Sequence, residues 1–564
     1  MTEIHYDTII DNATIYDGSG SPAHVGSLAI KDGRIAAIAP TLKNAISMQR
    51  IDATGLSLMP GIIDSHTHYD AQITWDPYLA QSVQMGVTTA LIGNCGFTIA
   101  PCLPKNRDLV MKNLTQVEGM SLDSLREGID WAFETFPEYM NLIERKGCAI
   151  NLAAFVGHST LRTHVMGSEA SDRAATTTEI QAMRLMLDEA LACGAIGFAT
   201  TSSTSHSAYD GRPMPSRLAA QEEFDVLLDG LRESKRGSLM LTKGPATPTP
   251  TLMQWAKRCE RPFLVAALLH SSLMPDGVFD DLDFIGKANE EGLQVKGAVA
   301  TTPLSFDFTF DTPYPLEPLK GWKPYFGAKG DKLKQALKSK TLRDEIRAEL
   351  SVSARRLFSG DWTLVHLLQT ELPAYQRFEH QSIAAIAKEL GKDPLDTMFD
   401  LALEDDLRTL FSVVSLNNDE KAVARLLSHE HSLVSLSDAG AHLSFLDESG
   451  FGLVLLGYWS RDKKIMSVEQ AVYRLTKAQA DFFSIRERGE LKVGNHADLL
   501  LFDLNKVGRG NKRRLNDLPA KATRVATEAI GVEGVWVNGV RVADKAGALN
   551  AATPGTLLRD CAMA

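Results

Sequence analysis

The chain contains little cysteine and lacks any Cys-x-x-Cys pair. Six cysteines are spread widely over 564 residues. This content argues against a disulfide framework, so most of these thiols are expected to be small buried side chains. They are Cys95, Cys102, Cys148, Cys193, Cys259 and Cys561.

Long apolar runs and an excess of basic residues are also missing. No stretch of about 18 uninterrupted apolar residues occurs, and the start, MTEIHYDTII, has the early acidic residues that a signal peptide lacks. Lys and Arg number 59 against 70 Asp and Glu, a net charge of −11. These features predict a cytoplasmic protein with a small-molecule partner, and neither a membrane nor a nucleic acid as its main partner. Neither G-x-G-x-x-G nor G-x-x-x-x-G-K-[ST] is present, so no residues are assigned to a nucleotide cofactor.

Eight short apolar runs, each ending in polar residues, are the main positive feature. Between them lie segments such as TTTEIQAMRLMLDEALACG, where Thr176 and Glu179 have the spacing of a helical capping box. Apolar strands alternating with helices predict an α/β fold, and eight units predict a (β/α)8 TIM-like barrel. An open doubly wound sheet is the alternative, but it does not require eight units. The runs are LSLMPGIIDSHTH, VTTALIGNCG, AINLAAFVGHST, GAIGFATTSS, SLMLTKG, PFLVAALLH, LQVKGAVATTP and SLVSLSDAGAH.

The length of the chain and the character of its two ends predict more than one domain. Turn-separated β runs near both ends, such as DTIIDNATIYDG and GVEGVWVNGVRVAD, predict a small β-sandwich made from residues 1–58 and 486–564. The barrel would then span residues 59–485. A helical insertion at about residues 304–431 is expected between strands seven and eight, because the gap is too long for a simple connection. Within it, KGDKLKQALKSKTLRDEIRAEL predicts a solvated helix face, and IAAIAKELGKDPLDTMFDLAL predicts helices that cap the barrel mouth.

Five potential metal ligands stand at the predicted strand ends. His66 and His68 are two residues apart, a spacing that places both on one face of a strand. Cys95, His270 and Asp438 end the second, sixth and eighth runs. Each alone has an ordinary structural interpretation, as an inert thiol, a core histidine or a turn residue. A barrel brings all five to the same end, and the set of imidazole, thiolate and carboxylate ligands predicts zinc.

The motifs PGIIDSHTHYDAQ, GVTTALIGNCG, FVGHSTLR, SLSDAGAH and GNHADLLLFD together resemble the amidohydrolase superfamily. More narrowly, they are similar to its N-acyl-D-amino-acid deacylase (D-aminoacylase) branch. The resemblance covers nearly the full length and is strongest up to about Arg162 and after about Ser435. GNCG is the most specific piece, because that branch uses this cysteine as a bridging metal ligand where many relatives use a carboxylated lysine.

This resemblance implies a zinc-dependent hydrolysis. His66 and His68 would bind one metal position, Cys95 and His270 the other, with one or two Zn2+ ions in all. Water activated by the metal would attack the carbonyl of a small-molecule amide. Asp438 would take the proton of that water and pass it to the departing amine. The implied activity is N-acyl-D-amino-acid deacylation.

Three positions qualify what the resemblance implies. Lys243 stands at the fifth strand end, where the branch has a histidine, and it is either a ligand as a carbamate or a buried or substrate-binding lysine. Ser272 occupies the position of a lysine that holds the substrate carboxylate in the branch. His158, at the third strand end, either donates a hydrogen bond to the substrate or packs behind the site.

Two other functions are compatible with the sequence. Ser272 favours hydrolysis of a different amide, lactam or cyclic imide that has no free carboxylate. The missing fifth-strand histidine keeps open a protein of another class, a metal-binding barrel with a ligand-binding or lyase role. The sequence is also compatible with a homo-oligomer and leaves its size open.

Overall fold

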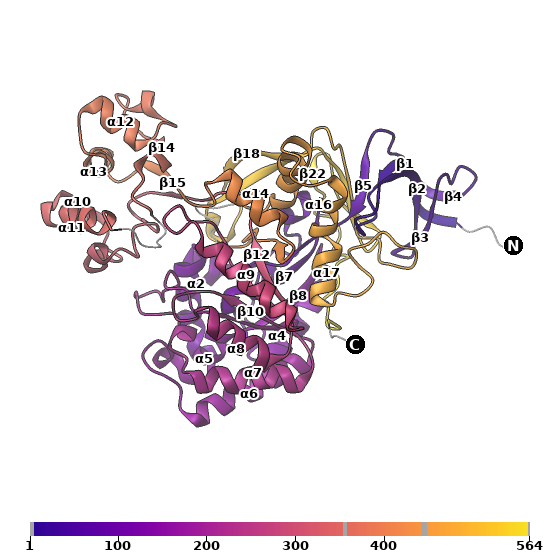
Figure 1. The fold of residues 1–564 in the computed structure, drawn as a ribbon, viewed down its shortest axis with the longest axis horizontal. Coiled ribbons are helices and arrows are strands. Elements are labelled where there is room, and N and C mark those ends of the chain that lie inside the picture. Colours follow the sequence, from indigo (N-terminus) through magenta and orange to yellow (C-terminus); the bar gives the residue numbers. More distant parts are fainter. Residues whose placement is uncertain (1–4, 353–357, 442–447, 562–564) are drawn as a thin grey trace.

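The computed structural model describes residues 5–352, 358–441 and 448–561, which form three packed regions (Figure 1). A parallel barrel occupies the middle, a sheet made from both chain ends lies on one side of it, and a lobe formed by the insertion projects from the other. Each region contains its own cluster of buried apolar side chains. Within the described residues, every helix is too short or too polar to span a lipid bilayer.

The eight predicted barrel strands are all present in one sheet of parallel strands. Their spatial order follows the chain from β6 to β12 and then β16. Where the first and last strands of the barrel meet, the hydroxyl of Ser65, next to β6, donates a hydrogen bond to Oγ of Ser435, next to β16, at 2.9 Å. This sequential order confirms the TIM-like barrel and excludes a doubly wound sheet, in which the strand order reverses. The strands are β6 (Ile62–Asp64), β7 (Val87–Ile92), β8 (Asn151–Gly157), β9 (Gly197–Thr201), β10 (Ser238–Thr242), β11 (Phe263–Ala266), β12 (Val295–Val299) and β16 (Ser432–Val434).

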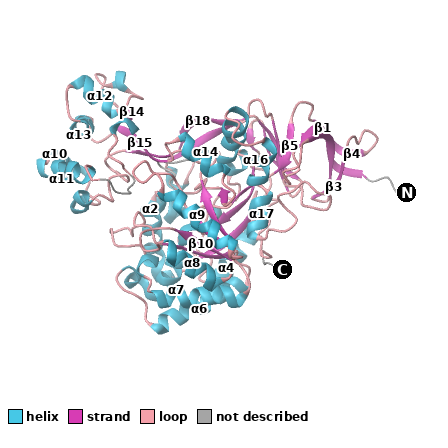
Figure 2. Cartoon of the chain, in the orientation of Figure 1, coloured by secondary structure: helices cyan, strands magenta, loops and turns pink. Residues whose placement is uncertain are grey.

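Helices cover the outside of the barrel (Figure 2). Helix α6 (Thr177–Ala192) begins with the predicted capping box, in which Thr176 and Glu179 exchange side-chain and backbone hydrogen bonds. Its buried stripe, which includes Met183 and Leu187, is the predicted one. The other barrel-side helices are α1 (Ala80–Gln84), α2 (Arg107–Glu118), α3 (Leu122–Gly128), α4 (Phe136–Lys146), α5 (His158–Met166), α7 (Gln221–Ser234), α8 (Thr249–Cys259), α9 (Gly277–Glu290), α14 (Glu420–Ser428), α15 (Phe451–Val454), α16 (Val468–Leu475) and α17 (Lys477–Phe483).

Both chain ends contribute strands to a single nine-stranded sheet, which confirms the predicted discontinuous β domain. Strand β5 lies between β1, from the start of the chain, and β17, from near its end. Leu58 and Trp536 are among the side chains of its core. The strands are β1 (His5–Ile15), β2 (His24–Lys31), β3 (Arg34–Ala39), β4 (Ile46–Asp52), β5 (Ser57–Pro60), β17 (Leu499–Phe502), β20 (Val532–Val537), β21 (Val540–Asp544) and β22 (Gly547–Ala548). A separate two-stranded ribbon consists of β18 (Gly508–Leu515) and β19 (Arg524–Ile530).

The insertion is a lobe of helices and strands. It contains the predicted helical segments, but also a three-stranded antiparallel sheet in the order β13-β15-β14 that sequence analysis missed. Helices α12 and α13, which were expected to cap the barrel mouth, pack on this lobe's own core instead, away from the barrel (Figure 1). The elements are β13 (Leu304–Phe308), α10 (Gly330–Lys338), α11 (Lys340–Leu350), β14 (Val365–Gln369), α12 (Ile383–Leu390), α13 (Pro394–Glu404) and β15 (Leu410–Leu416).

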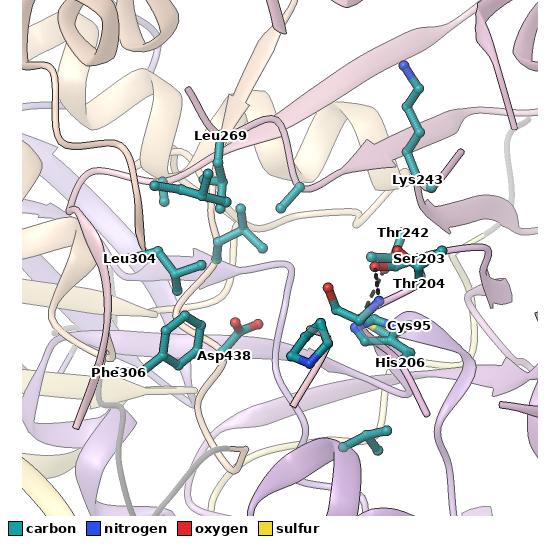
Figure 3. A pocket seen from close by; sticks show the side chains of 18 of the residues that line it. Cys95, Ser203, Thr204, His206, Thr242, Lys243, Leu269, Leu304, Phe306 and Asp438 are labelled. Atoms are coloured by element: carbon teal, nitrogen blue, oxygen red, sulfur yellow. Dashed lines mark hydrogen bonds between the residues drawn. The ribbon is translucent and has the colours of Figure 1, made fainter. Parts of the chain in front are cut away.

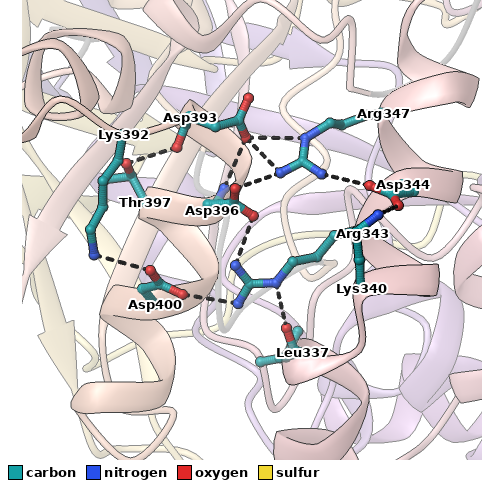
Figure 4. A network of polar contacts seen from close by, with 10 residues as sticks. All are labelled: Leu337, Lys340, Arg343, Asp344, Arg347, Lys392, Asp393, Asp396, Thr397 and Asp400. Carbon is teal, nitrogen blue, oxygen red and sulfur yellow. Dashed lines mark hydrogen bonds and ion pairs between the residues drawn. The ribbon is translucent and has the colours of Figure 1, made fainter.

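The charged stretch that predicted a solvated helix face joins two helices of this lobe (Figure 4). Arg343 on α11 donates to Asp396 at 2.7 Å and to Asp400 at 2.9 Å, both on α13. Arg347 contacts Asp393 at 3.0 Å. Some of the charged residues of this stretch therefore form ion pairs between α11 and α13 and do not lie on a solvated face.

Candidate metal and active site

His66 and His68 follow β6 in an extended segment that is held on both sides. The backbone N–H of Thr67 donates to Leu91 O at 3.2 Å, and that of His68 donates to Ala439 O at 2.7 Å. The two imidazole rings are 5.3 Å apart and both are buried. The pair therefore keeps the shared orientation that its spacing predicted, although the strand itself ends at Asp64.

Cys95 reaches the histidines from a tight turn after β7. Gly93, Cys95 and Gly96 all have positive φ angles, and a Cβ on Gly93 would lie 2.5 Å from Phe155 O. Glycine is needed there because the turn packs directly against the backbone of β8. The turn places Cys95 Sγ at 3.5 Å from His66 Nε2 and 4.0 Å from His68 Nε2.

Asp438 completes this group from the end of the eighth barrel strand. Its Oδ1 lies 3.2 Å from His66 Nε2 and 3.7 Å from His68 Nε2. His66, His68, Cys95 and Asp438 are called the His-Cys-Asp cluster below. All four of these residues were predicted from the sequence as site residues, and the structure brings them together.

The donor atoms of the His-Cys-Asp cluster fit a metal ion. One ligand atom from each of His66, His68 and Cys95 can be chosen so that all lie within 4.8 Å of one another. Burial raises the pKa of the Cys95 thiol, an effect that His68 partly offsets. A bound cation reverses that shift, because coordination deprotonates a thiol. Two imidazoles, a thiolate and a carboxylate are ligands that zinc accepts.

Two buried carboxyl groups that sequence analysis did not single out support the cluster. Glu118, at the end of α2, places Oε1 at 3.1 Å from His68 Nδ1. Asp70 accepts a hydrogen bond from the backbone of Gly93, at 2.9 Å, and so ties down the turn that carries Cys95. Burial raises the pKa of each carboxyl to about 7. Glu118 had no sequence signal, because an acidic residue at a helix end is ordinary.

His270, the remaining predicted ligand, does not join the cluster in the structure. Strand β11 ends at Ala266, and in the segment that follows, Ala267 and Leu269 line the cavity. Alternate residues of an extended segment point to opposite sides, which directs His270 toward Phe279 on α9 at 6.5 Å between rings. Its backbone N–H donates to Asn417 Oδ1 at 2.8 Å.

Lys243 and His158 also have partners away from the cluster. Lys243 points away from Cys95 (Figure 3), and its ammonium group contacts Asp281 on α9. His158 is fully buried and places Nε2 at 2.7 Å from Glu223 and Nδ1 at 2.8 Å from Thr200. Burial lowers the pKa of His158. Its side chain does not line the cavity, which places it in the packing behind the site.

A cavity of about 700 Å3 opens over the His-Cys-Asp cluster. Its walls come from the barrel strand ends and from the base of the insertion lobe, where Leu304 and Phe306 on β13 face inward. No described residue of α12 or α13 lines it. The cluster therefore lies at the C-terminal end of the barrel strands, beneath a chamber large enough for a small molecule.

Comparisons with known proteins identify the family of the chain and related structures. The sequence profile of the amidohydrolase family matches residues 49–290 and 366–543, most of the chain. The chain is 29% identical over 553 residues to the N-acyl-D-aspartate deacylase of Alcaligenes xylosoxydans xylosoxydans, covering 95% of this chain and 92% of that one. It is 28% identical over 548 residues to the D-aminoacylase of the same organism, covering 95% and 94%. A crystal structure of the N-acyl-D-glutamate deacylase of Bordetella bronchiseptica, complexed with zinc and a phosphonate mimic of the tetrahedral intermediate, has a TM-score of 0.68 and 25% identity and covers 99% and 100%.

Proposed function

The chain belongs to the amidohydrolase family, and on that premise we propose that it hydrolyses the amide bond of a small N-acyl compound at the His-Cys-Asp cluster. The enzyme class is hydrolysis of carbon–nitrogen bonds other than peptide bonds, as in its deacylase relatives. The observation that carries the proposal is the convergence of two histidines, a cysteine and an aspartate, from three strand ends, under one cavity.

The metal in this proposal is zinc, held by His66, His68 and Cys95 together with Asp438. The donor set supports this choice, as does the zinc in the glutamate deacylase structure. When bound, zinc supplies Lewis acidity, which polarises a carbonyl and makes water nucleophilic near neutral pH. Because the ammonium group of Lys243 contacts Asp281 and the grouped donor atoms are those of His66, His68 and Cys95, we assign one ion to the cluster.

The residues of the chain orient the reactants and move the proton. Asp438 takes a proton from the attacking water and delivers it to the amine as the C–N bond breaks. Its side chain is 22% exposed, so it reaches both the cluster and the cavity. Glu118 beside His68 Nδ1 keeps the proton on that nitrogen, which leaves Nε2 available as a ligand.

The test is release of an amine from N-acyl substrates by zinc-loaded and chelated enzyme. We expect turnover only in the zinc-loaded form. Cys95→Ala should lose zinc, whereas Asp438→Asn should keep the fold and lose most of its turnover, about 100-fold or more. His270→Gln is the matched control, a histidine at the same end of the barrel that should leave zinc content unchanged.

Two outcomes would contradict the proposal. Tight zinc binding without hydrolysis of any N-acyl substrate, unaltered in Asp438→Asn, would favour a ligand-binding or lyase role. Loss of zinc in His270→Gln but not in Cys95→Ala would move the metal site away from the His-Cys-Asp cluster.

A further inference from the structure

The cavity above the His-Cys-Asp cluster has two chemically different walls (Figure 3). Leu269, Leu304 and Phe306 face it from one side of Asp438. Leu269 comes from the end of β11, and the other two come from β13 of the insertion lobe. Further apolar residues of the cavity lining are Pro318, Leu319 and Leu416. Apart from Tyr314, whose ring lies 5.3 Å from that of Phe306, these side chains cannot form hydrogen bonds, so the wall suits an apolar group of the substrate.

The opposite wall is polar, and most of its polar groups are hydroxyls. Ser203, Thr204 and Thr242 line it from the ends of β9 and β10, next to His206 (Figure 3). Hydroxyls both donate and accept hydrogen bonds, and they do so without a fixed charge. This wall therefore suits an uncharged polar portion of the substrate, such as the amide itself or a neighbouring hydroxyl or carbonyl.

The charges around the cavity disfavour an anionic substrate. Four carboxyl side chains line it, those of Glu118, Glu349, Asp438 and Glu448. Glu448 is paired with Arg509 at 2.7 Å, whereas Glu118 and Asp438 face the two histidines of the cluster. Among the described lining residues, the lysine or arginine is Lys243, and its ammonium contacts Asp281. A substrate carboxylate placed here would compete with Asp438 and Glu118 for the histidines and the proposed zinc, and the lysine of the described lining already contacts Asp281.

From these walls and charges we propose that the substrate is an uncharged amide that carries a bulky apolar group, and not an N-acyl amino acid with a free carboxylate. This inference rests on the proposed function, since it names the substrate class of the same hydrolytic site. The apolar group lies against Leu269, Leu304 and Phe306, and the scissile amide lies between that wall and the hydroxyl wall, next to Asp438.

The first experiment compares matched substrates on the zinc-loaded enzyme. One series consists of neutral N-acyl amines whose acyl chain lengthens one methylene at a time, and the other consists of N-acyl-D- and N-acyl-L-amino acids with the same acyl chains. We expect kcat/KM to rise about fourfold per methylene in the neutral series until the chamber is filled. Each amino acid should be at least about tenfold poorer than its neutral counterpart.

A substitution that adds a positive charge at the edge of the cavity tests whether the charges there disfavour an anionic substrate. Met274 lines the cavity and is 49% exposed, so an arginine there should not disturb the fold. Met274→Arg should improve N-acyl amino acids relative to neutral amides by about tenfold, and Met274→Leu is the matched control without the charge. Phe306→Ala should flatten the chain-length dependence by opening the apolar wall.

The outcomes separate this inference from the proposed function. Turnover of N-acyl-D-amino acids at rates equal to or above those of the neutral series would overturn the inference and leave the hydrolase intact. A chain-length series without any trend would overturn the apolar part. Absence of turnover in both series, with zinc bound, would instead count against hydrolysis itself.

Discussion

The Thr242 hydroxyl donates a hydrogen bond to Cys95 Sγ at 3.1 Å. Thr242 is the last residue of β10, three strands away from β7, so the fifth barrel strand contributes to the cluster through a sulfur contact. A hydrogen bond to a metal-binding thiolate orients the sulfur and stabilises its negative charge.

Removal of that hydroxyl should weaken metal binding. Thr242→Val keeps the shape of the side chain, and we expect it to raise the zinc dissociation constant about 10-fold to 100-fold. Competition with a chromophoric chelator measures this without reference to activity. Thr242→Ser retains the hydroxyl and should bind zinc nearly as the native protein does. Equal affinity in both variants would mean that the contact has no influence on the metal.

The buried carboxyl of Asp64 should make the metal-free protein less stable as the pH rises. Burial raises its pKa from 3.8 to about 7 in the folded state. Between about pH 4 and pH 7 the folded protein therefore retains a proton that the unfolded chain has released, so the free energy of unfolding decreases through this window. The full effect of the shift is about 4 kcal/mol.

Asp64→Asn removes this titration and should flatten the pH dependence. Denaturant unfolding of chelated protein at about pH 5 and about pH 7.5 measures the difference. Asp123→Asn, at an exposed position, is the control, and its free energy of unfolding should change with pH as that of the native protein does. If Asp64→Asn kept the pH dependence of the native protein, other buried groups such as Asp70 and Glu118 would account for that dependence.

The buried contacts of Glu223 should matter for stability and little for catalysis. Glu223 contacts both His158, at 2.7 Å, and Arg162, and all three side chains are fully buried. Glu223→Gln leaves Arg162 as an uncompensated buried charge, so we expect a loss of about 3 kcal/mol. Glu222→Gln changes an exposed neighbour on the same helix and should have almost no effect.

Activity per folded molecule distinguishes packing from substrate binding at this site. Because His158 does not line the cavity, kcat and KM of folded Glu223→Gln should remain within about twofold of native values. A specific rise in KM would assign His158 to the substrate.

Lys243 should prove to be a structural partner of Asp281. Lys243→Gln leaves a buried carboxylate without its cation, and we expect a loss of about 1 to 3 kcal/mol with zinc content unchanged. Lys257→Gln, which breaks an exposed pair with Glu291, is the control and should cost less than about 1 kcal/mol. Loss of zinc in Lys243→Gln would restore the lysine as a ligand.

Strand ends could be predicted from the sequence, but the directions of individual side chains beyond them could not. His66 and Cys95 follow the ends of β6 and β7 by two and three residues, whereas Asp438 and His270 both follow the ends of their strands by four. At that distance the direction of a side chain depends on the local path of the loop. Beyond β11, that path directs Leu269 and not His270 into the cavity. The sheet of the insertion lobe could not be predicted from the sequence either. Its strands β13 and β15 are short, and they pair across more than a hundred residues of the chain.

The sheet that both chain ends share has a consequence for the order in which the protein is made. Strand β5 pairs with β17 and leads within two residues into β6, the strand that carries His66 and His68 toward the cavity. On the ribosome, β5 emerges early but waits for β17 until almost all of the barrel has been synthesised. One edge of β5 can pair with β1 at once, but its other edge stays open until β17 is made, so a nascent chain holds its histidine pair on an incomplete sheet until synthesis is nearly finished.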